Sequence, residues 1–169
     1  MALDDNASVQ RVRLALEAHA PGAGSRIIAL SDSARTAAEA AAGLGCEVGA
    51  IVKSLVFDSG GPGNGRAVMA LVAGDRLCDT AALGRALGLE KPPKRASADL
   101  VREATGFAIG GVSPFGHPGK LPMAIDASLQ RFALLHAAAG HPHAVFPLTY
   151  AELLAWTGGL AVADLAPAS

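Results

Sequence analysis

One lysine stands inside an otherwise apolar segment, Ile51-Val52-Lys53-Ser54-Leu55-Val56-Phe57. Because alternate side chains of a β-strand share a face, Lys53 is predicted to lie on the same face as Ile51, Leu55 and Phe57. Both faces of this strand are apolar, which is typical of a strand buried on both sides. A desolvated ammonium is costly unless an anionic or strongly polar group meets it, so we expect Lys53 to have such a partner.

A glycine-rich turn, Gly110-Gly111-Val112-Ser113-Pro114-Phe115-Gly116, lies in the second half of the chain. Glycine lets main-chain amides approach a ligand, while Pro114 fixes its own φ and biases Ser113 toward extended geometry. Amides held in this way can stabilise a carbonyl oxygen as it gains negative charge. We expect this turn to form a rigid wall facing the Lys53 ammonium across a small cleft; a purely structural turn is the alternative.

Other chemical motifs are weaker. In Gly111-Val112-Ser113-Pro114-Phe115, phenylalanine replaces the last glycine of Gly-x-Ser-x-Gly, so a nucleophile elbow is not specified, and an esterase using Ser113 is only an alternative. His117 and His136 are possible bases without an obvious orienting partner. His141 and His143 flank Pro142 without a third ligand nearby, which indicates a surface loop rather than a metal site.

Asp126 ends the apolar segment Met123-Ala124-Ile125-Asp126 and precedes Ala127-Ser128-Leu129. Its carboxylate is expected either to accept main-chain N–H bonds from the following turn or to form a wall of the pocket near Lys53. The sequence leaves both interpretations open.

Length and composition predict one domain over residues 1–169, because 169 residues, 51% of them apolar, can bury a core without disulfides or metals. The acidic start, Met1 to Asn6, lacks the basic and apolar segments of a secretory signal, so we expect a soluble cytoplasmic protein without a membrane partner. Cys46 and Cys78 have no pairing or metal spacing and are expected to be reduced thiols.

The net charge of −1 argues against a general nucleic-acid coat and against a DNA partner. The densest basic segment is Lys91-Pro92-Pro93-Lys94-Arg95, with Arg102 close behind. This segment is interpreted either as a solvated loop or as a small patch able to hold the end of one nucleic-acid strand.

Hydrophobic periodicity and capping signals predict alternating helices and strands. A loop at residues 58–65 that leads into a strand indicates an antiparallel hairpin rather than a phosphate loop, so a purely parallel sheet is excluded and a mixed α/β domain is favoured. Helices are expected at 8–19 with Asn6 or Ser8 as cap, from Ser31–Ser33 to Gly43 and Gly45, at 80–87 capped by Asp79, at 98–104 capped by Ser97, and from Thr149, which has capping-box spacing with Glu152. Strands are expected at 26–30, 50–57, 66–72, 123–126 and 131–136.

Together these segments resemble the YbaK/EbsC family, which includes free-standing prolyl-tRNA editing proteins and the editing insertion of bacterial prolyl-tRNA synthetase. The resemblance runs from about Thr36 to Leu154, and the motifs are specific through their order rather than singly. They are Thr36-Ala37-Ala38-Glu39-Ala40-Ala41 with Leu44-Gly45, the Lys53 strand, Gly74-Asp75-Arg76, Thr105-Gly106, the Gly110 to Gly116 turn, and Ile125-Asp126-Ala127-Ser128-Leu129.

The resemblance implies a mixed α/β (α+β) fold with a central, mainly antiparallel, partly closed sheet flanked by helices. It also implies hydrolysis of the ester that joins a wrong amino acid to the acceptor end of a tRNA, without a metal ion, another cofactor or a protein acyl intermediate. Lys53 and Gly110 are expected to be catalytic. Ser54, Gly111, Val112, Ser113, Pro114 and Asp126 are expected to contact the substrate.

Partner and substrate are less constrained by the sequence. A synthetase partner could supply tRNA selectivity, and a non-catalytic module that binds tRNA ends or a synthetase is the competing interpretation. The sequence does not show whether His141 or His143 corresponds to the histidine that some alanine-clearing relatives carry, so it leaves the amino acid unassigned among small ones.

Overall fold

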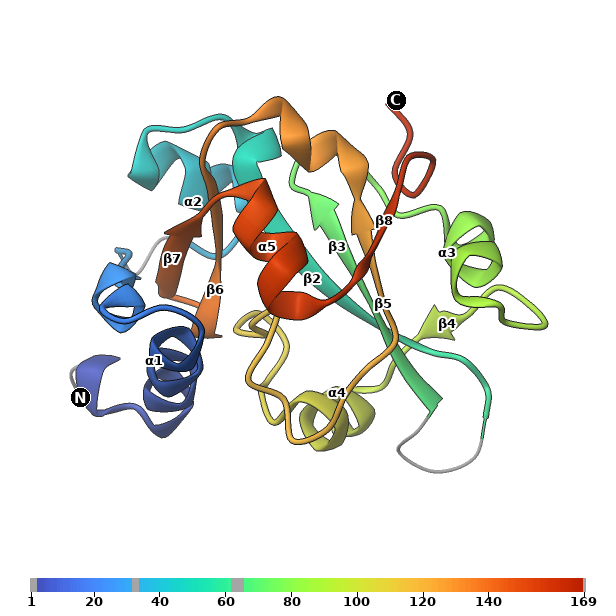
Figure 1. The fold of residues 1–169 in the computed structure, drawn as a ribbon, viewed down its shortest axis with the longest axis horizontal. Helices are drawn as coiled ribbons and strands as arrows, with labels where there is room; N and C mark the ends of the chain where they lie inside the picture. The colour runs from blue at the N-terminus through green and yellow to red at the C-terminus, as the bar shows by residue number, and fades with distance from the viewer. Residues whose placement is uncertain (1–2, 32–33, 62–65, 169) are drawn as a thin grey trace.

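Eight strands form one mixed sheet in the computed structural model, which describes residues 3–31, 34–61 and 66–168. The strand order is β1-β7-β6-β2-β3-β5-β8, and the short strand β4 also pairs with β2. The pairs β1–β7, β2–β3, β2–β4 and β6–β7 are antiparallel, whereas β2–β6, β3–β5 and β5–β8 are parallel. The predicted mixed α/β architecture with a mainly antiparallel sheet is therefore confirmed (Figure 1).

Helices are interspersed with the strands along the chain. The strands are β1 (Ile28–Ala29), β2 (Ile51–Asp58), β3 (Ala67–Ala73), β4 (Lys94–Arg95), β5 (Met123–Asp126), β6 (Leu135–His141), β7 (Ala144–Leu148) and β8 (Leu160–Val162). The helices are α1 (Ala7–His19), α2 (Ala37–Leu44), α3 (Thr80–Leu87), α4 (Ala98–Thr105) and α5 (Tyr150–Thr157), with 3-10 segments η1 (Leu3–Asp5), η2 (Ala23–Arg26), η3 (Val48–Ala50) and η5 (Ala127–Arg131).

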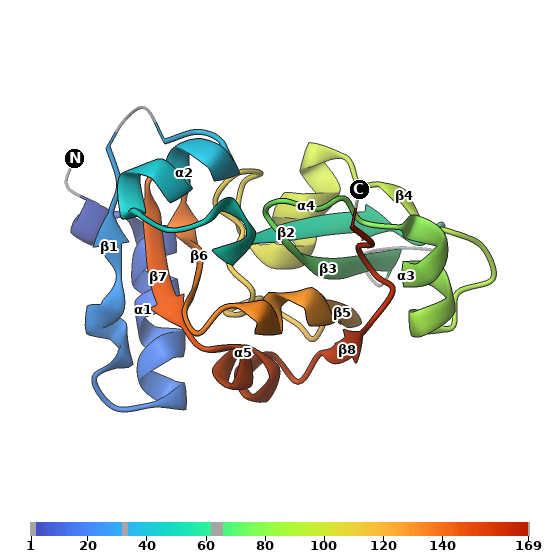
Figure 2. The same cartoon turned by 90° about the horizontal axis from the view of Figure 1, so that it is seen from above.

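Helices cover both faces of the sheet, which explains why β2 and β3 read as apolar runs. On one face, side chains of α1, α4 and α5 pack with Val52, Val56 and Met69 in the main core. On the other face, Leu83 of α3 packs with Val68 and neighbouring strand residues, while alanines of α2 pack on Ile51. Figure 2 shows α1 along β6 and β7, with α3 at the far end of the molecule.

Local capping signals fix most helix ends as predicted. Side chains of Asn6, Asp79, Ser97 and Thr149 accept main-chain N–H bonds at the starts of α1, α3, α4 and α5, and Thr149 forms a capping box with Glu152. Each cap side chain satisfies donors that a helix start leaves unpaired. The helix boundaries read from these signals are confirmed.

Three predicted elements had wrong boundaries. The strand expected at 26–30 covers only Ile28–Ala29, because Arg26 ends the η2 turn. The helix expected from Ser31–Ser33 begins at Ala37, because Thr36 caps it by accepting from the Glu39 N–H; residues 32 and 33 lie outside the described part of the chain. The strand expected at 131–136 begins at Leu135 and runs to His141, because residues 127–131 form the η5 turn instead. Its alanine run has low β-propensity, and pairing with β2 and β7 overrides that preference.

Candidate functional site

Strand β2 has a gap along one edge. Strand β3 pairs with residues 52–58 on one side of β2, while on the other side β6 pairs with Ile51 and Val52, and β4 with Phe57 and Asp58. Within the described chain, no strand pairs with residues 53–55 on that second side. We call this stretch of β2 the edge gap.

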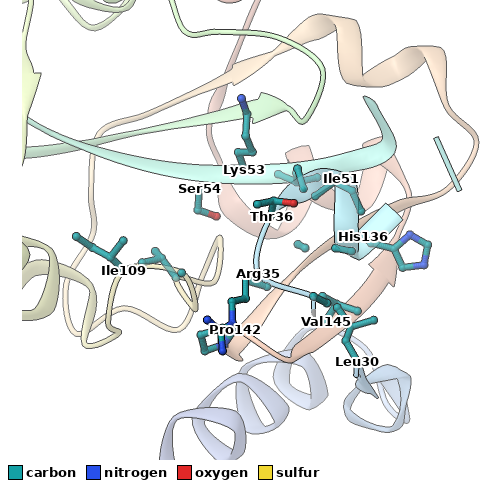
Figure 3. Close-up of a pocket in the computed structure, with 18 of the residues that line it drawn as sticks. Leu30, Arg35, Thr36, Ile51, Lys53, Ser54, Ile109, His136, Pro142 and Val145 are labelled. Atoms are coloured by element: carbon teal, nitrogen blue, oxygen red, sulfur yellow. The ribbon is translucent and has the colours of Figure 1, made fainter. Parts of the chain in front are cut away.

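Two cavities meet at the edge gap. The first, of about 270 Å³, lies between the gap, Leu30, the segment from Ala34 to Ala40, and residues Pro142 and Val145 (Figure 3). The second, of about 530 Å³, extends along β2 toward Leu77, Cys78 and Arg95. The residues that line both cavities are Ser54, Leu55, Ile109, Gly110 and Val112. The structure therefore brings the β2 edge and the predicted glycine turn to one site.

Ser54 lies where the two cavities join. The Val56 carbonyl accepts a hydrogen bond from the Ala96 N–H on the β4 side, at 3.4 Å, and alternate residues of a strand direct their main-chain groups to the same side. The main-chain N–H and C=O of Ser54 therefore face the edge gap. The Ser54 hydroxyl oxygen is also buried without a hydrogen-bond partner. A buried polar group left unpaired in this way is available to a ligand.

Lys53 lies on the face predicted for it, but its ammonium does not face the glycine turn. The side chains of Lys53 and Ser54 leave β2 on opposite sides (Figure 3). The Lys53 Nζ donates a hydrogen bond to the main-chain oxygen of Arg76. The polar partner that burial demands is thus a carbonyl oxygen. The expectation of a cleft with the ammonium opposite the turn needs correction, because strand alternation sends Ser54, not Lys53, to that side.

Burial lowers the pKa of Lys53, while the carboxylates of Asp75 and Asp126 oppose this effect by stabilising the ammonium. Lys53 still belongs to the site, because it is one of the residues that line the first cavity. The half-buried ammonium is held beside the edge gap rather than inside it.

Asp126 is fully buried and has two main-chain partners. Its carboxylate accepts hydrogen bonds from the N–H groups of Ala73 and Ser128, at 3.0 and 2.9 Å. The interpretation of Asp126 as the cap of the following turn is confirmed, because its side chain caps η5. It lines neither cavity, and its charge reaches the site through its effect on Lys53.

The glycine turn is tightly specified by its surroundings. Gly110 has φ of +97°, a conformation that favours glycine, and it lines both cavities. A Cβ on Gly111 would lie 2.8 Å from the main-chain nitrogen of His141. The Gly111 N–H donates to the Ala108 carbonyl at 3.0 Å, so it is not free for a ligand. Gly110 and Val112 are the residues of this turn that line both cavities.

Ser113 and Pro114, in the middle of the turn, are buried and line neither of the two cavities. The Ser113 hydroxyl accepts from the Phe115 N–H at 3.4 Å, and its carbonyl lies 2.8 Å from Nε2 of His117. Ser113 has no exposed surface, which argues against the esterase alternative because a nucleophile must reach its substrate.

One residue gains importance only in the structure. His136 of β6 lines the first cavity, is only 8% exposed, and has an Nδ1 atom without a hydrogen-bond partner. Burial lowers its pKa, which favours the neutral ring. In the sequence His136 is only one of several histidines. Its position beside Ile51 results from the parallel pairing of β2 with β6, which the sequence does not reveal.

The thiols do not extend this chemistry. Cys46 and Cys78 are free cysteines, as predicted. Cys78 lines the second cavity, but burial raises its pKa to about 11, so the protonated thiol is a poor nucleophile. Over the residues that the structure describes, no three His, Cys, Asp or Glu side chains gather into a group that could hold a metal ion. The same residues contain no helix long and apolar enough to span a bilayer.

Comparison with known proteins places this fold and cleft in a defined class. The sequence profile of the aminoacyl-tRNA editing domain matches residues 31–155, which include all residues that line the two cavities except Leu30. The chain therefore belongs to the aminoacyl-tRNA editing domain family. Its resemblance to the YbaK group within that family is confirmed, and the family assignment supports a deacylase role.

Individual relatives agree with this assignment. A crystal structure described as a candidate trans-editing enzyme for prolyl-tRNA synthetase is similar over 94% of this chain and 96% of its own, with TM-score 0.83 and 42% identity. The hypothetical protein APE2540 is similar over 93% of this chain and 99% of its own, with TM-score 0.78 and 28% identity. The uncharacterised Bacillus subtilis (strain 168) protein YwhH is 32% identical over 72% of this chain and 74% of its own length.

Proposed function

We propose that this chain is a trans-acting deacylase that hydrolyses the ester between a wrong, small amino acid and the 3′ end of a tRNA, with tRNA-Pro as the first tRNA to test. The observation that carries the proposal is the meeting of two cavities at the edge gap of β2, opposite Gly110 and Val112. An aminoacyl-tRNA end has two unlike parts, an amino acid and an adenosine, and it needs two adjoining pockets with the ester between them.

The first cavity receives the amino acid in this proposal. Its volume of about 270 Å³ and its apolar lining, which includes Ile51, Ala137 and Val145, suit a small side chain. Alanine, cysteine, serine, threonine and 2-aminobutyrate are the candidates. Because one methylene is worth only about 1 to 3 kcal/mol of discrimination, a single lining residue can change the preferred amino acid.

The ester lies at the junction of the cavities, where Ser54 and the Gly110–Val112 segment face each other. Main-chain N–H groups of Gly110 and Val112 stabilise the negative charge that develops on the carbonyl oxygen, while Ser54 orients the aminoacyl group. Water adds to the carbonyl carbon, the bond to the ribose oxygen breaks, and that oxygen takes a proton. The products are the free amino acid and an uncharged tRNA.

Lys53 stabilises this arrangement through its charge. The ammonium is bound to the Arg76 carbonyl, and from that position its positive charge attracts the phosphate and ester oxygens of a substrate at the edge gap. No protein nucleophile is required, because an aminoacyl ester is already activated. Gly111, Ser113, Pro114 and Asp126 support the site by fixing the turn and the charge beside Lys53.

A panel of mischarged tRNAs tests the proposal. Each tRNA is incubated with wild type and with Lys53→Ala, and release of the amino acid is followed. We expect the wild type to release one or a few small amino acids and the variant to release none above the uncatalysed rate. A wild type that binds these tRNAs without releasing any amino acid would instead support the non-catalytic binding module.

A further inference from the structure

We infer that the surface formed by Lys91, Lys94 and Arg95 binds phosphates of the tRNA acceptor strand where that strand leaves the second cavity. This inference rests on the proposed function and adds to it the path of the RNA. We call these three residues the basic exit. It adjoins the second cavity, because Arg95 lines that cavity and also a third one of about 220 Å³ that contains Lys91 and Lys94.

The charge of the basic exit is concentrated and accessible. Lys91, Lys94 and Arg95 are all exposed. One carboxylate, Asp58, lies in the same third cavity, but it is engaged by Arg66 at 3.2 Å and by the Gly60 N–H at 2.8 Å. The whole chain has a net charge of −1, so this local excess of cations does not follow from an overall positive charge. Attraction to phosphate depends on such local cations rather than on the total charge.

The backbone that carries the basic exit is rigid. Strand β4 pairs with β2 through Arg95 with Phe57 and Lys94 with Asp58. Two prolines, Pro92 and Pro93, precede the strand, and Pro93 is buried. Cations held on a fixed backbone lose less conformational entropy on binding than cations on a free loop. The alternative of a solvated loop therefore does not describe β4.

The second cavity supplies the matching site for the terminal base. Leu77 and Ile109 line it and are among the most exposed large apolar side chains of the described residues, at 80% and 62%. Two exposed apolar side chains at one cavity mouth provide a surface for the flat faces of a base, because contact removes both from water. With the base between them and the ester at Ser54, the preceding phosphates extend past Arg95 toward Lys94 and Lys91.

The test compares a long and a short substrate. Mischarged tRNA carries the acceptor-strand phosphates, whereas 2′(3′)-O-aminoacyl-adenosine carries the same ester without them. In Lys91→Ala/Lys94→Ala we expect KM for the tRNA to rise roughly 10-fold near 0.1 M salt, with an unchanged rate on the short ester. The dependence of log KM on log salt should also weaken by about 0.7 for each phosphate that the variant no longer neutralises.

A matched control removes one exposed ammonium at a time. Lys120 is exposed and lines none of these three cavities, so Lys120→Ala should leave KM for the tRNA unchanged while Lys94→Ala raises it. An equal effect of the double variant on both substrates, or none on the tRNA, would overturn the inference. If wild type hydrolyses neither substrate, the proposed function fails, and fluorescence anisotropy with uncharged tRNA then decides the inference by the affinity difference between wild type and the double variant.

Discussion

The Lys53 ammonium donates its hydrogen bond to the main-chain oxygen of Arg76, on the opposite side of β2 from Ser54. From the sequence, Lys53 and Ser54 are expected to act in the same cleft, whereas the structure places their side chains on opposite sides of the strand. Ser54 presents its main chain and a buried hydroxyl to the junction of the cavities, while Lys53 supplies positive charge from behind the strand. Substitutions at the two positions should therefore affect activity and stability in different ways.

Replacing Lys53 with alanine should lower kcat/KM for deacylation by at least about 100-fold, the size of effect typical of a lost charge-stabilising group. The fold should persist, because burial lowers the pKa of Lys53 and its charged form is therefore poorly accommodated. Steady-state kinetics and thermal unfolding measure the two quantities. An unchanged kcat/KM in a folded variant would remove Lys53 from the mechanism.

Replacing Ser54 with alanine should lower deacylation without lowering stability. The Ser54 hydroxyl is buried without a partner, so its removal should leave the free energy of unfolding unchanged or raise it by up to about 1 kcal/mol. Urea denaturation gives this free energy, and kinetics with a mischarged tRNA gives the loss of activity. Ser25→Ala serves as the comparison, since Ser25 is exposed and lines neither the first nor the second cavity. Full activity in Ser54→Ala would contradict the proposed role of this hydroxyl.

Replacing Gly111 with alanine should destabilise the protein by about 1 to 3 kcal/mol, because the new Cβ would overlap the main chain at His141. Gly43→Ala is a suitable contrast. Gly43 lies in α2 with nothing within 4 Å of the added Cβ, so this change should stabilise the helix by about 0.5 to 1 kcal/mol. Chemical denaturation of both variants gives the two free energies. Equal stability of the two would show that the turn at Gly111 adapts easily.

Replacing Glu152 with glutamine should reduce stability in a pH-dependent manner. Two hydrogen bonds from Arg26, at 2.9 and 3.0 Å, hold the pKa of Glu152 below its ordinary value. A lowered carboxyl pKa gives stability that is present above the unfolded pKa, near 4.5, and is lost as pH falls through the folded value. Both side chains are partly exposed, so we expect a loss of only about 1 kcal/mol near neutral pH.

The two proteins should then converge in stability below about pH 4, where Glu152 becomes protonated in the wild type as well. Glutamine keeps one oxygen that can accept from the Thr149 N–H in the capping box, but its amide nitrogen cannot accept from Arg26, so the variant removes the charge together with one hydrogen bond. Thermal unfolding across the pH range measures the difference. A gap between wild type and variant that is constant with pH would show that the ion pair does not stabilise the fold.

The sequence predicted the features that depend on local rules. Caps at Asn6, Asp79, Ser97 and Thr149, and the hairpin of β2 with β3, follow from signals a few residues long. The face of Lys53 also followed from the period of a strand.

Features set by distant pairing could not be predicted in this way. The edge gap exists because β6 pairs only with the start of β2 and β4 only with its end. The position of His136 at the first cavity depends on the same β2–β6 pairing. The direction of the Lys53 ammonium depends on where the Arg76 carbonyl lies after the chain turns beyond β3. None of these relationships leaves a pattern in neighbouring residues.

An incomplete ladder along β2 also has an evolutionary consequence. Lengthening β4 or β6 by two residues would pair the remaining main-chain groups and is expected to make the protein harder to unfold, yet it would fill the space that a ligand requires. Selection for rigidity and selection for catalysis therefore act in opposite directions on the same few peptide groups. Heat-tolerant members of this family should shorten loops or strengthen helix ends before they extend either of these strands.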